Sequence, residues 1–433
     1  MKSPSRQLFG SAILLLALAA PLRGQSLHPG EPDILGFSRE RLARIDRVMQ
    51  QYVDSGRVAG VVTLILRHGK VAYVRAFGSA DREAGRRMTP DALFRIASQS
   101  KAITSVAVMM LVEEGRLRLN DPVSRYLPGF AHTVVAERTD TGLALIPATR
   151  PITIRHLLTH TAGISYGTDS LVAERYRAAG LGTAAGWGWY TADKDEPICT
   201  TMDRLGTLLF VAQPGTRFVY GYALDLLGCV LERVSGEPLD QFFRTRIFQP
   251  LGMKDTFFFP PAAVASRLAT VYAATADSGL QRAPDGPRGQ GDYLAGPRMS
   301  FAGGAGLVST ATDYARFLQM VLNGGALDGA RILSPATVSL MTTNQVDTLF
   351  GGRASGFGLG FQILESPGLA GEYGSVGRFG WGGAYGTNYW VDPGEDLVAV
   401  YMVQLLPARG LDLADKFRTL VYQAIVAPGR GSR

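Results

Sequence analysis

The sequence contains one Ser-x-x-Lys pattern, Ser98-Gln99-Ser100-Lys101. A serine hydroxyl is a poor nucleophile near neutral pH unless a base takes its proton. On a helix, positions three apart share a face, so the Lys101 amine can lie beside the Ser98 hydroxyl. The apolar neighbours favour the desolvated setting in which a lysine acts as a base; they are Phe94, Ile96, Ala97 and Ile103. The pattern predicts a nucleophilic Ser98, against the alternative of a surface pair at a helix start.

Two further segments carry groups that such a reaction needs. Tyr220 precedes a predicted helix at 224–234 and is a candidate proton-handling group, although a tyrosine at a helix entrance most often packs. Trp381-Gly382-Gly383-Ala384 opens a predicted strand, where glycines let a ligand approach the backbone. The N–H groups of Ser98 and Ala384 would then form an oxyanion hole, in which each donor contributes about 3–4 kcal/mol. A β-bulge or a sheet edge is the alternative for this stretch.

A second serine motif, Gly163-Ile164-Ser165-Tyr166-Gly167, competes with the first. It matches the nucleophile elbow, which needs a strand before it, a helix after it and a histidine later in the chain. A helical pattern precedes it here, and the five histidines lie at 28, 68, 132, 156 and 160, so none follows Ser165. We therefore interpret this motif as a glycine-rich turn that closes a helix.

The elements that would position these residues lie at both ends of the chain. The N-terminal part predicts a helix capped by Ser38, a hairpin of strands 61–66 and 71–77 turning at His68-Gly69, and a helix from Ala97 to Gly115. The C-terminal part predicts a helix at 313–322, paired strands at 386–391 and 397–404, and a helix at 413–425. The simplest fold places both ends in one antiparallel sheet.

The middle of the chain has a different character. Helical patterns at 154–159, 202–211 and 224–234 alternate with loops rich in glycine, proline and aromatic residues. We predict an α/β (α+β) fold: an antiparallel sheet flanked by N- and C-terminal helices, formed by 25–119 and 299–433, with a mostly helical lobe inserted at 120–298. A cleft between two such lobes is a common small-molecule site. Candidate aromatic residues for an acyl pocket, if they are not ordinary loop anchors, are Tyr166, Trp187, Trp189 and Tyr190.

The first 24 residues have the layout of an export signal. Lys2 and Arg6 precede an uncharged stretch with an apolar centre from Ile13 to Ala20, followed by small residues. This run is short for a membrane-spanning helix, and an uncleaved anchor is the alternative. We expect a cleaved signal peptide at 1–24 and a periplasmic or secreted protein with no stable membrane span. We expect Cys199 and Cys229 to be unpaired, although an oxidising compartment permits a bridge.

The charge gives no sign of a nucleic-acid partner. The net charge is +7, and Lys2, Arg6 and Arg23 account for three of these charges, which leaves +4. The remaining basic residues are scattered, whereas nucleic-acid binding usually shows a basic stripe or arm. The histidines form no metal-ligand pattern such as His-Glu-x-x-His, so we expect no metal and no cofactor.

Taken together, the motifs resemble the serine β-lactamase and penicillin-binding-protein superfamily, and most of all class C β-lactamases and the related family VIII carboxylesterases. The resemblance runs from about Phe37 to Val426, as one β-lactamase-like domain. It rests on blocks in the family's order: Phe94 to Lys101, Thr153 to Thr161, Pro214-Gly215 leading to Tyr220, Gly303 to Thr310, and Trp381-Gly382-Gly383 in the place of Lys-Thr-Gly.

The resemblance implies a role for each motif. Ser98 would be the acylated nucleophile, Lys101 and Tyr220 the proton-relay pair, and the amides of Ser98 and Ala384 the oxyanion hole. The substrate-binding positions would be Trp381, Gly382, Gly383 and Tyr222. The implied fold is an α/β sandwich with a helical lobe, and no metal takes part.

Two departures from the lactamase pattern indicate the substrate. Trp381 stands where lactamases carry the lysine that binds the substrate carboxylate, and Tyr222 replaces the asparagine that touches the substrate amide. Both changes favour a carboxylesterase acting on short-chain or neutral small-molecule esters. The alternatives are a β-lactamase or D-amino-acid peptidase acting on amides, acyl transfer to an acceptor other than water, and a non-catalytic or slow cell-wall ligand-binding protein.

Overall fold

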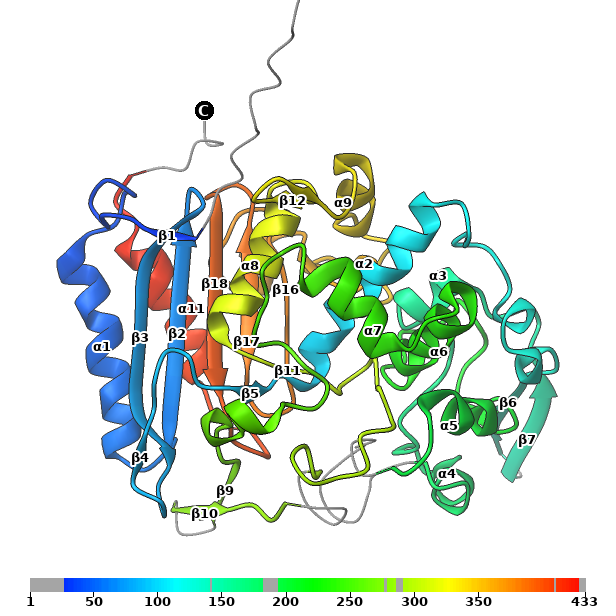
Figure 1. Cartoon of the computed structure of the whole chain (residues 1–433). Coiled ribbons are helices and arrows are strands. Elements are labelled where there is room, and N and C mark those ends of the chain that lie inside the picture. The colour runs from blue at the N-terminus through cyan, green and yellow to red at the C-terminus, as the bar shows by residue number, and fades with distance from the viewer. Residues whose placement is uncertain are drawn as a thin grey trace, which may run out of the picture.

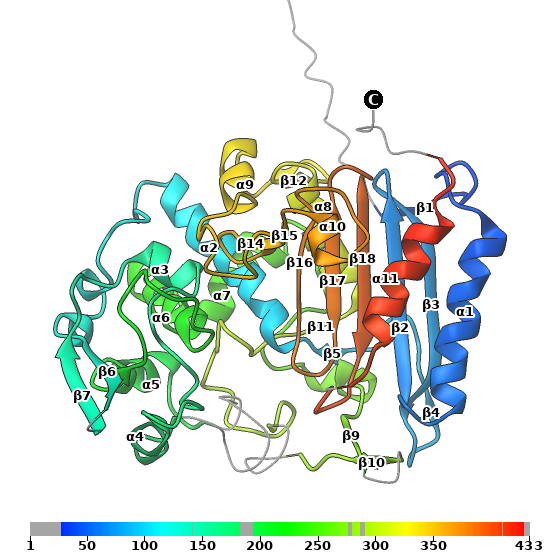
Figure 2. The same ribbon diagram turned by 180° about the vertical axis from the view of Figure 1, so that it is seen from behind.

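The computed structural model describes residues 27–140, 142–181, 194–275, 279–285, 291–408 and 410–427. The expected signal peptide, together with Trp187, Trp189 and Tyr190, lies outside these residues. A central sheet with flanking helices forms one lobe, and a mostly helical lobe lies on the other side of helix α2 (Figures 1 and 2). Among the described residues, no helix has the length and apolar character needed to cross a bilayer.

The described strands include a nine-stranded sheet built from both ends of the chain. Its path is β1-β3-β2-β18-β17-β16-β15-β14, with β4 paired to β3. Neighbours are antiparallel except β1 and β3. The strands are β1 (His28–Pro29), β2 (Gly60–Arg67), β3 (Lys70–Asp81), β4 (Arg86–Arg87), β14 (Ser355–Phe357), β15 (Gln362–Leu364), β16 (Phe379–Gly382), β17 (Asn388–Asp392) and β18 (Leu397–Val403).

The predicted N-terminal hairpin is confirmed as β2 and β3. His68 and Gly69 both have positive φ, 54° and 70°, as a two-residue turn matched to the twist of the strands requires. β2 is buried along its whole length because its two faces enter two different cores: Val62 and Leu64 face one, and Val61 and Ile65 face the other. The continuous apolar run therefore marks a central strand covered on both sides.

Helices α1 (Arg39–Asp54) and α11 (Leu413–Ala424) pack side by side on one face of this sheet (Figure 2). The Ser38 side chain accepts a hydrogen bond from the Arg41 N–H at 3.3 Å, which caps α1 as predicted. Ile45 and Met49 of α1 and Phe417 of α11 bury their side chains in one cluster. Both terminal helices of the prediction are confirmed.

Helices α8 (Ala311–Leu322) and α2 (Ser100–Glu113) lie on the opposite side. α8 packs on β18 and β2, and α2 runs between the sheet and the helical lobe (Figure 1). Gly115 has φ 70° just after α2, in agreement with the predicted helix end. Shorter elements of this lobe are β5 (Phe94–Arg95), β11 (Val308–Ser309), β12 (Ala326–Leu327), β13 (Ala330–Arg331), α9 (Pro335–Met341) and α10 (Pro367–Ala370).

The inserted segment contains α3 (Ile154–Leu158), α4 (Ala173–Ala178), α5 (Ile198–Leu205), α6 (Ala223–Ser235), α7 (Leu239–Phe243), β6 (Val134–Thr139), β7 (Gly142–Pro147), β8 (Leu209–Phe210), β9 (Tyr272–Ala274) and β10 (Leu280–Arg282). The prediction of a helix through 202–211 is wrong at its end. α5 stops at Leu205, and β8 pairs in parallel with β6, where Leu209 and Phe210 are buried. β9 contacts the sheet lobe, since the Tyr272 N–H donates to the Gln404 carbonyl at 3.0 Å.

The expectation of unpaired cysteines is also wrong. Cys199 on α5 and Cys229 on α6 form a disulfide with a Cα–Cα distance of 5.0 Å. The two helices pack against each other, which brings these positions within the range that a disulfide spans. The separation of 30 residues in the chain carries no information about that packing.

α3 begins with a capping box that includes a titratable group. The Thr153 side chain accepts from the His156 N–H, and His156 Nδ1 accepts from the Thr153 N–H at 3.2 Å. Burial, followed by the charges of Arg150 and Arg155, lowers the pKa of His156 to about 4. The accepting Nδ1 must be unprotonated, and the lowered pKa keeps it so near neutral pH.

Because its pKa is lowered, we predict that His156 makes the free energy of unfolding fall in acid. Its folded pKa lies below the ordinary 6.5, so its contribution is present above pH 6.5 and is lost as the pH falls towards about 4. In His156→Gln the amide oxygen can accept the same N–H without titrating. Denaturant unfolding across this range should show a steeper decline for the wild type than for His156→Gln. The exposed His28→Gln serves as the control, and parallel curves for wild type and His156→Gln would contradict the assignment.

Candidate active site

Ser98 lies in a tight turn between β5 and α2. The turn is a single 3₁₀ turn, Ala97–Gln99, that continues into α2. Ala97 has φ 43°, in the left-handed region that alanine rarely occupies, so the backbone is strained next to the serine. The surrounding contacts hold this conformation, and Ser98 is only 6% exposed. Strain maintained beside a candidate nucleophile is typical of a functional turn.

Lys101 lies one turn further along α2 and is 2% exposed. Its Nζ donates to Ser98 Oγ at 3.2 Å, to the Tyr166 hydroxyl at 2.9 Å and to the Gly304 carbonyl at 2.6 Å. An ammonium has three N–H donors, and these three oxygens use all of them. The spacing of the Ser-x-x-Lys pattern therefore brings the two groups together as the sequence indicates. When Lys101 is neutral, its lone pair can accept the Ser98 proton across the same contact.

Tyr220 lies in the loop before α6 and faces the same site. Its hydroxyl accepts from Trp381 Nε1 at 3.0 Å, and Lys101 Nζ lies 4.7 Å from the centre of its ring. The structure thus places four of the predicted residues around one point: Ser98, Lys101, Tyr220 and Trp381. The Trp381 contact orients the tyrosine hydroxyl from the β16 side.

The buried His160 ring packs against the Tyr220 ring. The two ring centres are 4.5 Å apart, and His160 is 1% exposed. Neither ring nitrogen has a hydrogen-bond partner among the described residues. Burial, with a further contribution from the charge of Lys101, lowers the pKa of His160 well below its ordinary value. His160 is therefore neutral, and its ring packs against Tyr220.

The glycines after β16 allow this strand to approach the Ser98 turn. A Cβ at Gly383 would lie 2.4 Å from the Ile96 carbonyl oxygen, which no side chain can tolerate. Ala384 then packs in the same small cluster as Ala97. The segments that carry the Ser98 and Ala384 amides are therefore in contact, and their use as an oxyanion hole remains a prediction.

An aromatic wall borders the site on the Tyr220 side. It consists of Phe218, Phe350, Phe357 and Trp381, with neighbouring ring centres between 4.7 and 6.0 Å apart. Phe350 and Trp381 are only partly buried. Such a surface offers apolar contact and no charge to a substrate group that lies against it.

Sequence reasoning gave three residues no part in holding Lys101: Tyr166, which it named only as a candidate acyl-pocket aromatic, Gly304 and Asp225. Tyr166 belongs to the rejected serine motif, in which Ser165 Oγ accepts from the Gly167 N–H and simply closes a turn. Gly304 supplies a carbonyl to Lys101, and its own N–H donates to Asp225 Oδ1 at 2.9 Å. The sequence held one signal for Asp225: it is the single acidic residue within the apolar run Ala223-Leu224-Asp225-Leu226-Leu227.

Tyr222, a predicted substrate-binding residue, lies deeper than the other predicted positions. It is 2% exposed, and its ring packs edge-to-face on Tyr166 with centres 4.8 Å apart. It therefore contacts the site through Tyr166.

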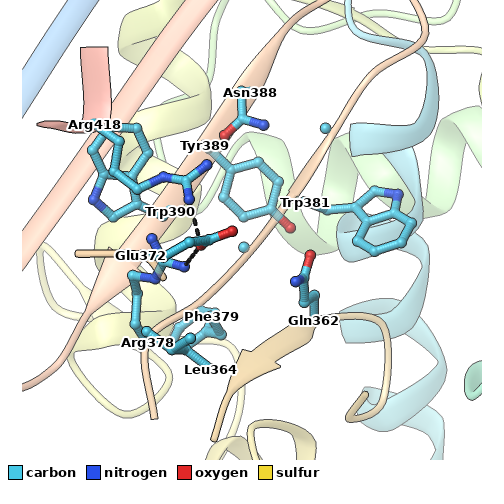
Figure 3. A pocket seen from close by; sticks show the side chains of 12 residues that line it. Gln362, Leu364, Glu372, Arg378, Phe379, Trp381, Asn388, Tyr389, Trp390 and Arg418 are labelled. Carbon is cyan, nitrogen blue, oxygen red and sulfur yellow. Dashed lines mark hydrogen bonds and ion pairs between the residues drawn. The ribbon is translucent and has the colours of Figure 1, made fainter. Parts of the chain in front are cut away.

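A small cavity of about 80 Å³ lies next to β16 (Figure 3). Glu372 joins Arg378 and Arg418 at one end, and Trp381 and Gln362 also line the cavity. Burial would raise the pKa of Glu372, but the hydrogen bond from Arg378 and the charge of Arg418 outweigh it and lower the pKa. Ser98, Lys101 and Tyr220 do not line this cavity. No group of three or more potential metal ligands occurs in the part of the chain that the structure describes.

A serine hydrolase is the class of enzyme that this arrangement defines, because the lysine beside Ser98 supplies the base that the serine lacks. The Beta-lactamase family model matches residues 45–423, and the chain belongs to that family. Esterase EstB from Burkholderia gladioli is 35% identical over 81% of this chain and 87% of its own. Lovastatin esterase from Penicillium rubens is 30% identical over 88% of this chain and 98% of its own.

The solved structure of EstCE1, a hydrolase with promiscuous acyltransferase activity, is similar throughout. It has a TM-score of 0.74 and 32% identity, and the match covers 88% of this chain and 99% of that one. The resemblance inferred from the motifs and the mixed α/β fold are both confirmed. The relatives are esterase-like, which implies small-molecule substrates.

The roles of Tyr220 and Tyr166 can be distinguished by replacing each of them with phenylalanine. Tyr220→Phe should lower kcat/KM about 10³-fold because proton transfer is lost. Tyr166→Phe should lower it only about tenfold because one hydrogen bond to Lys101 is lost. Initial rates of p-nitrophenyl ester hydrolysis measure both effects, with thermal unfolding as the check on folding. The reverse order would assign proton transfer to Tyr166.

Proposed function

We propose that the protein is a carboxylesterase that hydrolyses small neutral esters through an acyl-enzyme on Ser98. The observation that carries this proposal is the environment of Ser98 Oγ. A buried lysine lies 3.2 Å away, and the Trp381 indole, bonded to the Tyr220 hydroxyl, occupies the place of a carboxylate-binding lysine. The aromatic wall then supports an apolar acyl or alcohol group without offering it a counter-charge.

In the acylation step, Ser98 Oγ bonds to the acyl carbon while its proton passes to the neutral Lys101 amine. The amides of Ser98 and Ala384 would stabilise the resulting oxyanion. Collapse of this intermediate breaks the bond to the alcohol oxygen, which leaves with a proton delivered through Tyr220. The product is the Ser98 ester and a free alcohol.

In the deacylation step, water attacks the same acyl carbon. The pair of Lys101 and Tyr220 takes the proton from water and returns one to Ser98 Oγ as it leaves, which releases the carboxylic acid. An alcohol in the place of water would give acyl transfer from the same intermediate. EstCE1 has such an activity, and we treat transfer as a side reaction of the proposed esterase.

We also propose that the enzyme works in the periplasm or outside the cell. The basic start, the apolar stretch Ile13 to Ala20 and the small residues after it support cleavage of a signal peptide near residue 24. The disulfide between Cys199 and Cys229 supports an oxidising compartment.

The decisive measurement compares p-nitrophenyl butyrate hydrolysis by the mature protein and by Ser98→Ala. The rate should fall to that of the uncatalysed reaction in the variant, because no other nucleophile replaces the serine. Ser165→Ala is the matched control and should keep the wild-type rate. An undiminished rate in Ser98→Ala would overturn the assignment, and a loss in Ser165→Ala alone would transfer it to Ser165.

Two further substrates separate the proposed esterase from its alternatives. A chromogenic cephalosporin and a D-alanyl-D-alanine peptide should both be turned over far more slowly than the ester. Faster turnover of either would make the protein a β-lactamase or a D-amino-acid peptidase. A stable adduct on Ser98 without turnover of any substrate would support a binding protein.

A further inference from the structure

We propose that Asp225 is a positioning residue for Lys101: its buried carboxylate fixes Gly304, whose carbonyl holds the lysine beside Ser98, and its charge balances the buried ammonium. This inference rests on the proposed function because it assigns Asp225 to the activation of Ser98. Asp225 touches none of the reacting atoms among its described contacts, so it acts through Lys101.

The burial of Asp225 requires an explanation. It lies in the first turn of α6 and is 3% exposed. A buried carboxylate costs free energy unless it is hydrogen-bonded and balanced by an opposite charge. Burial raises the pKa of Asp225, while the charge of Lys101 and the Gly304 N–H act in the opposite direction. Lys101 and Asp225 both bond to Gly304, so Lys101 is the opposite charge available to balance the carboxylate.

The contact with Gly304 is closer than any side chain there would allow. A Cβ on Gly304 would lie 2.3 Å from Asp225 Oδ2 and 2.8 Å from Oδ1. Gly304 is not among the glycines with positive φ, so its backbone conformation does not require glycine. The absence of a side chain is needed for the approach of the carboxylate itself.

Gly304 joins Asp225 to Lys101 through its two backbone groups. Its N–H donates to Asp225 Oδ1 at 2.9 Å, and its carbonyl accepts from Lys101 Nζ at 2.6 Å. Gly303, the residue before it, is bonded to α2, because Thr104 Oγ1 donates to the Gly303 carbonyl at 2.7 Å. The loop is thus fixed between α2 and α6, and Asp225 is its anchor on the α6 side.

The charges of the two residues form a buried pair separated by one glycine. Lys101 forms no direct ion pair among the described residues, and its three contacts are to neutral oxygens. Asp225 likewise has no direct ion pair in the described part of the chain. Without the carboxylate, the positive charge of Lys101 would be buried with no compensating negative charge.

The first experiment measures the labelling of Ser98 by a fluorophosphonate. Ser98 Oγ bonds to phosphorus, fluoride leaves, and the serine proton passes to the base, so the maximal labelling rate reports nucleophile activation. Asp225→Asn keeps an oxygen for the Gly304 N–H but removes the charge. We expect this rate to fall about 100-fold, with the half-saturating probe concentration unchanged, because the ammonium that forms as Lys101 takes the Ser98 proton would then lack its counter-charge.

Asp313→Asn is the matched control. Asp313 is also a buried aspartate, 6% exposed, that accepts a backbone N–H, from Asp255 at 2.6 Å. It is bonded to neither Lys101 nor Gly304, so its variant should be labelled within about threefold of the wild-type rate. Wild-type labelling of Asp225→Asn, or an equal loss in Asp313→Asn, would overturn the inference and leave the proposed function intact. Failure to label Ser98 in the wild type would overturn both.

A second measurement needs no activity. A thermal-unfolding cycle combines Lys101→Met and Asp225→Asn. Each single change leaves one buried charge without its partner, whereas the double change removes both charges. We expect the double variant to unfold at a higher temperature than either single variant. A double variant that loses the sum of the two single losses would show that the charges are independent and would overturn the inference.

Discussion

The burial of one ammonium group organises this site. Lys101 is almost wholly removed from solvent, and each of its N–H groups must find an oxygen because an unmet donor on a buried cation is costly. The three oxygens come from the nucleophile turn, from the loop at Tyr166 and from the loop at Gly304. Segments far apart in the chain are thereby held within a few ångströms of one helix turn. Reactivity and local order have the same origin.

Glycines make these approaches to α2 possible. Gly304 admits Asp225, Gly383 admits the Ile96 carbonyl, and Gly360 lies where a Cβ would be 2.3 Å from Ser105 Oγ. Gly221 likewise leaves its Cβ position 2.3 Å from the Ile164 carbonyl, so the Tyr220 loop can lie directly on the loop before Tyr166. Backbone therefore meets backbone at Gly383 and Gly221, while at Gly304 and Gly360 a polar side chain reaches the backbone directly. These close approaches let several segments gather around one lysine.

Local patterns in the sequence predicted what is local in the structure. The Ser98–Lys101 contact, the hairpin turn at His68 and Gly69 and the cap at Ser38 all depend on residues a few positions apart. The contact of Tyr166 with Lys101, the approach of Asp225 to Gly304 and the disulfide of Cys199 depend on how distant elements pack, and no spacing encodes them. The end of the helix predicted at 202–211 is wrong for the same reason, because Leu209 and Phe210 form a strand that pairs with the distant β6.

The order of the strands has a consequence for the synthesis of the protein. β2 pairs with β18, the last of the described strands, from Val61 to Arg67. β16 leads to Ala384, which packs against a turn near the beginning of the chain. Such non-local pairing forms late, because the ends must meet before the contacts stabilise them. A chain that ends between Lys101 and β16 therefore contains both of these residues but lacks the segment that carries Ala384. The candidate centre is therefore assembled only when almost all of the chain exists.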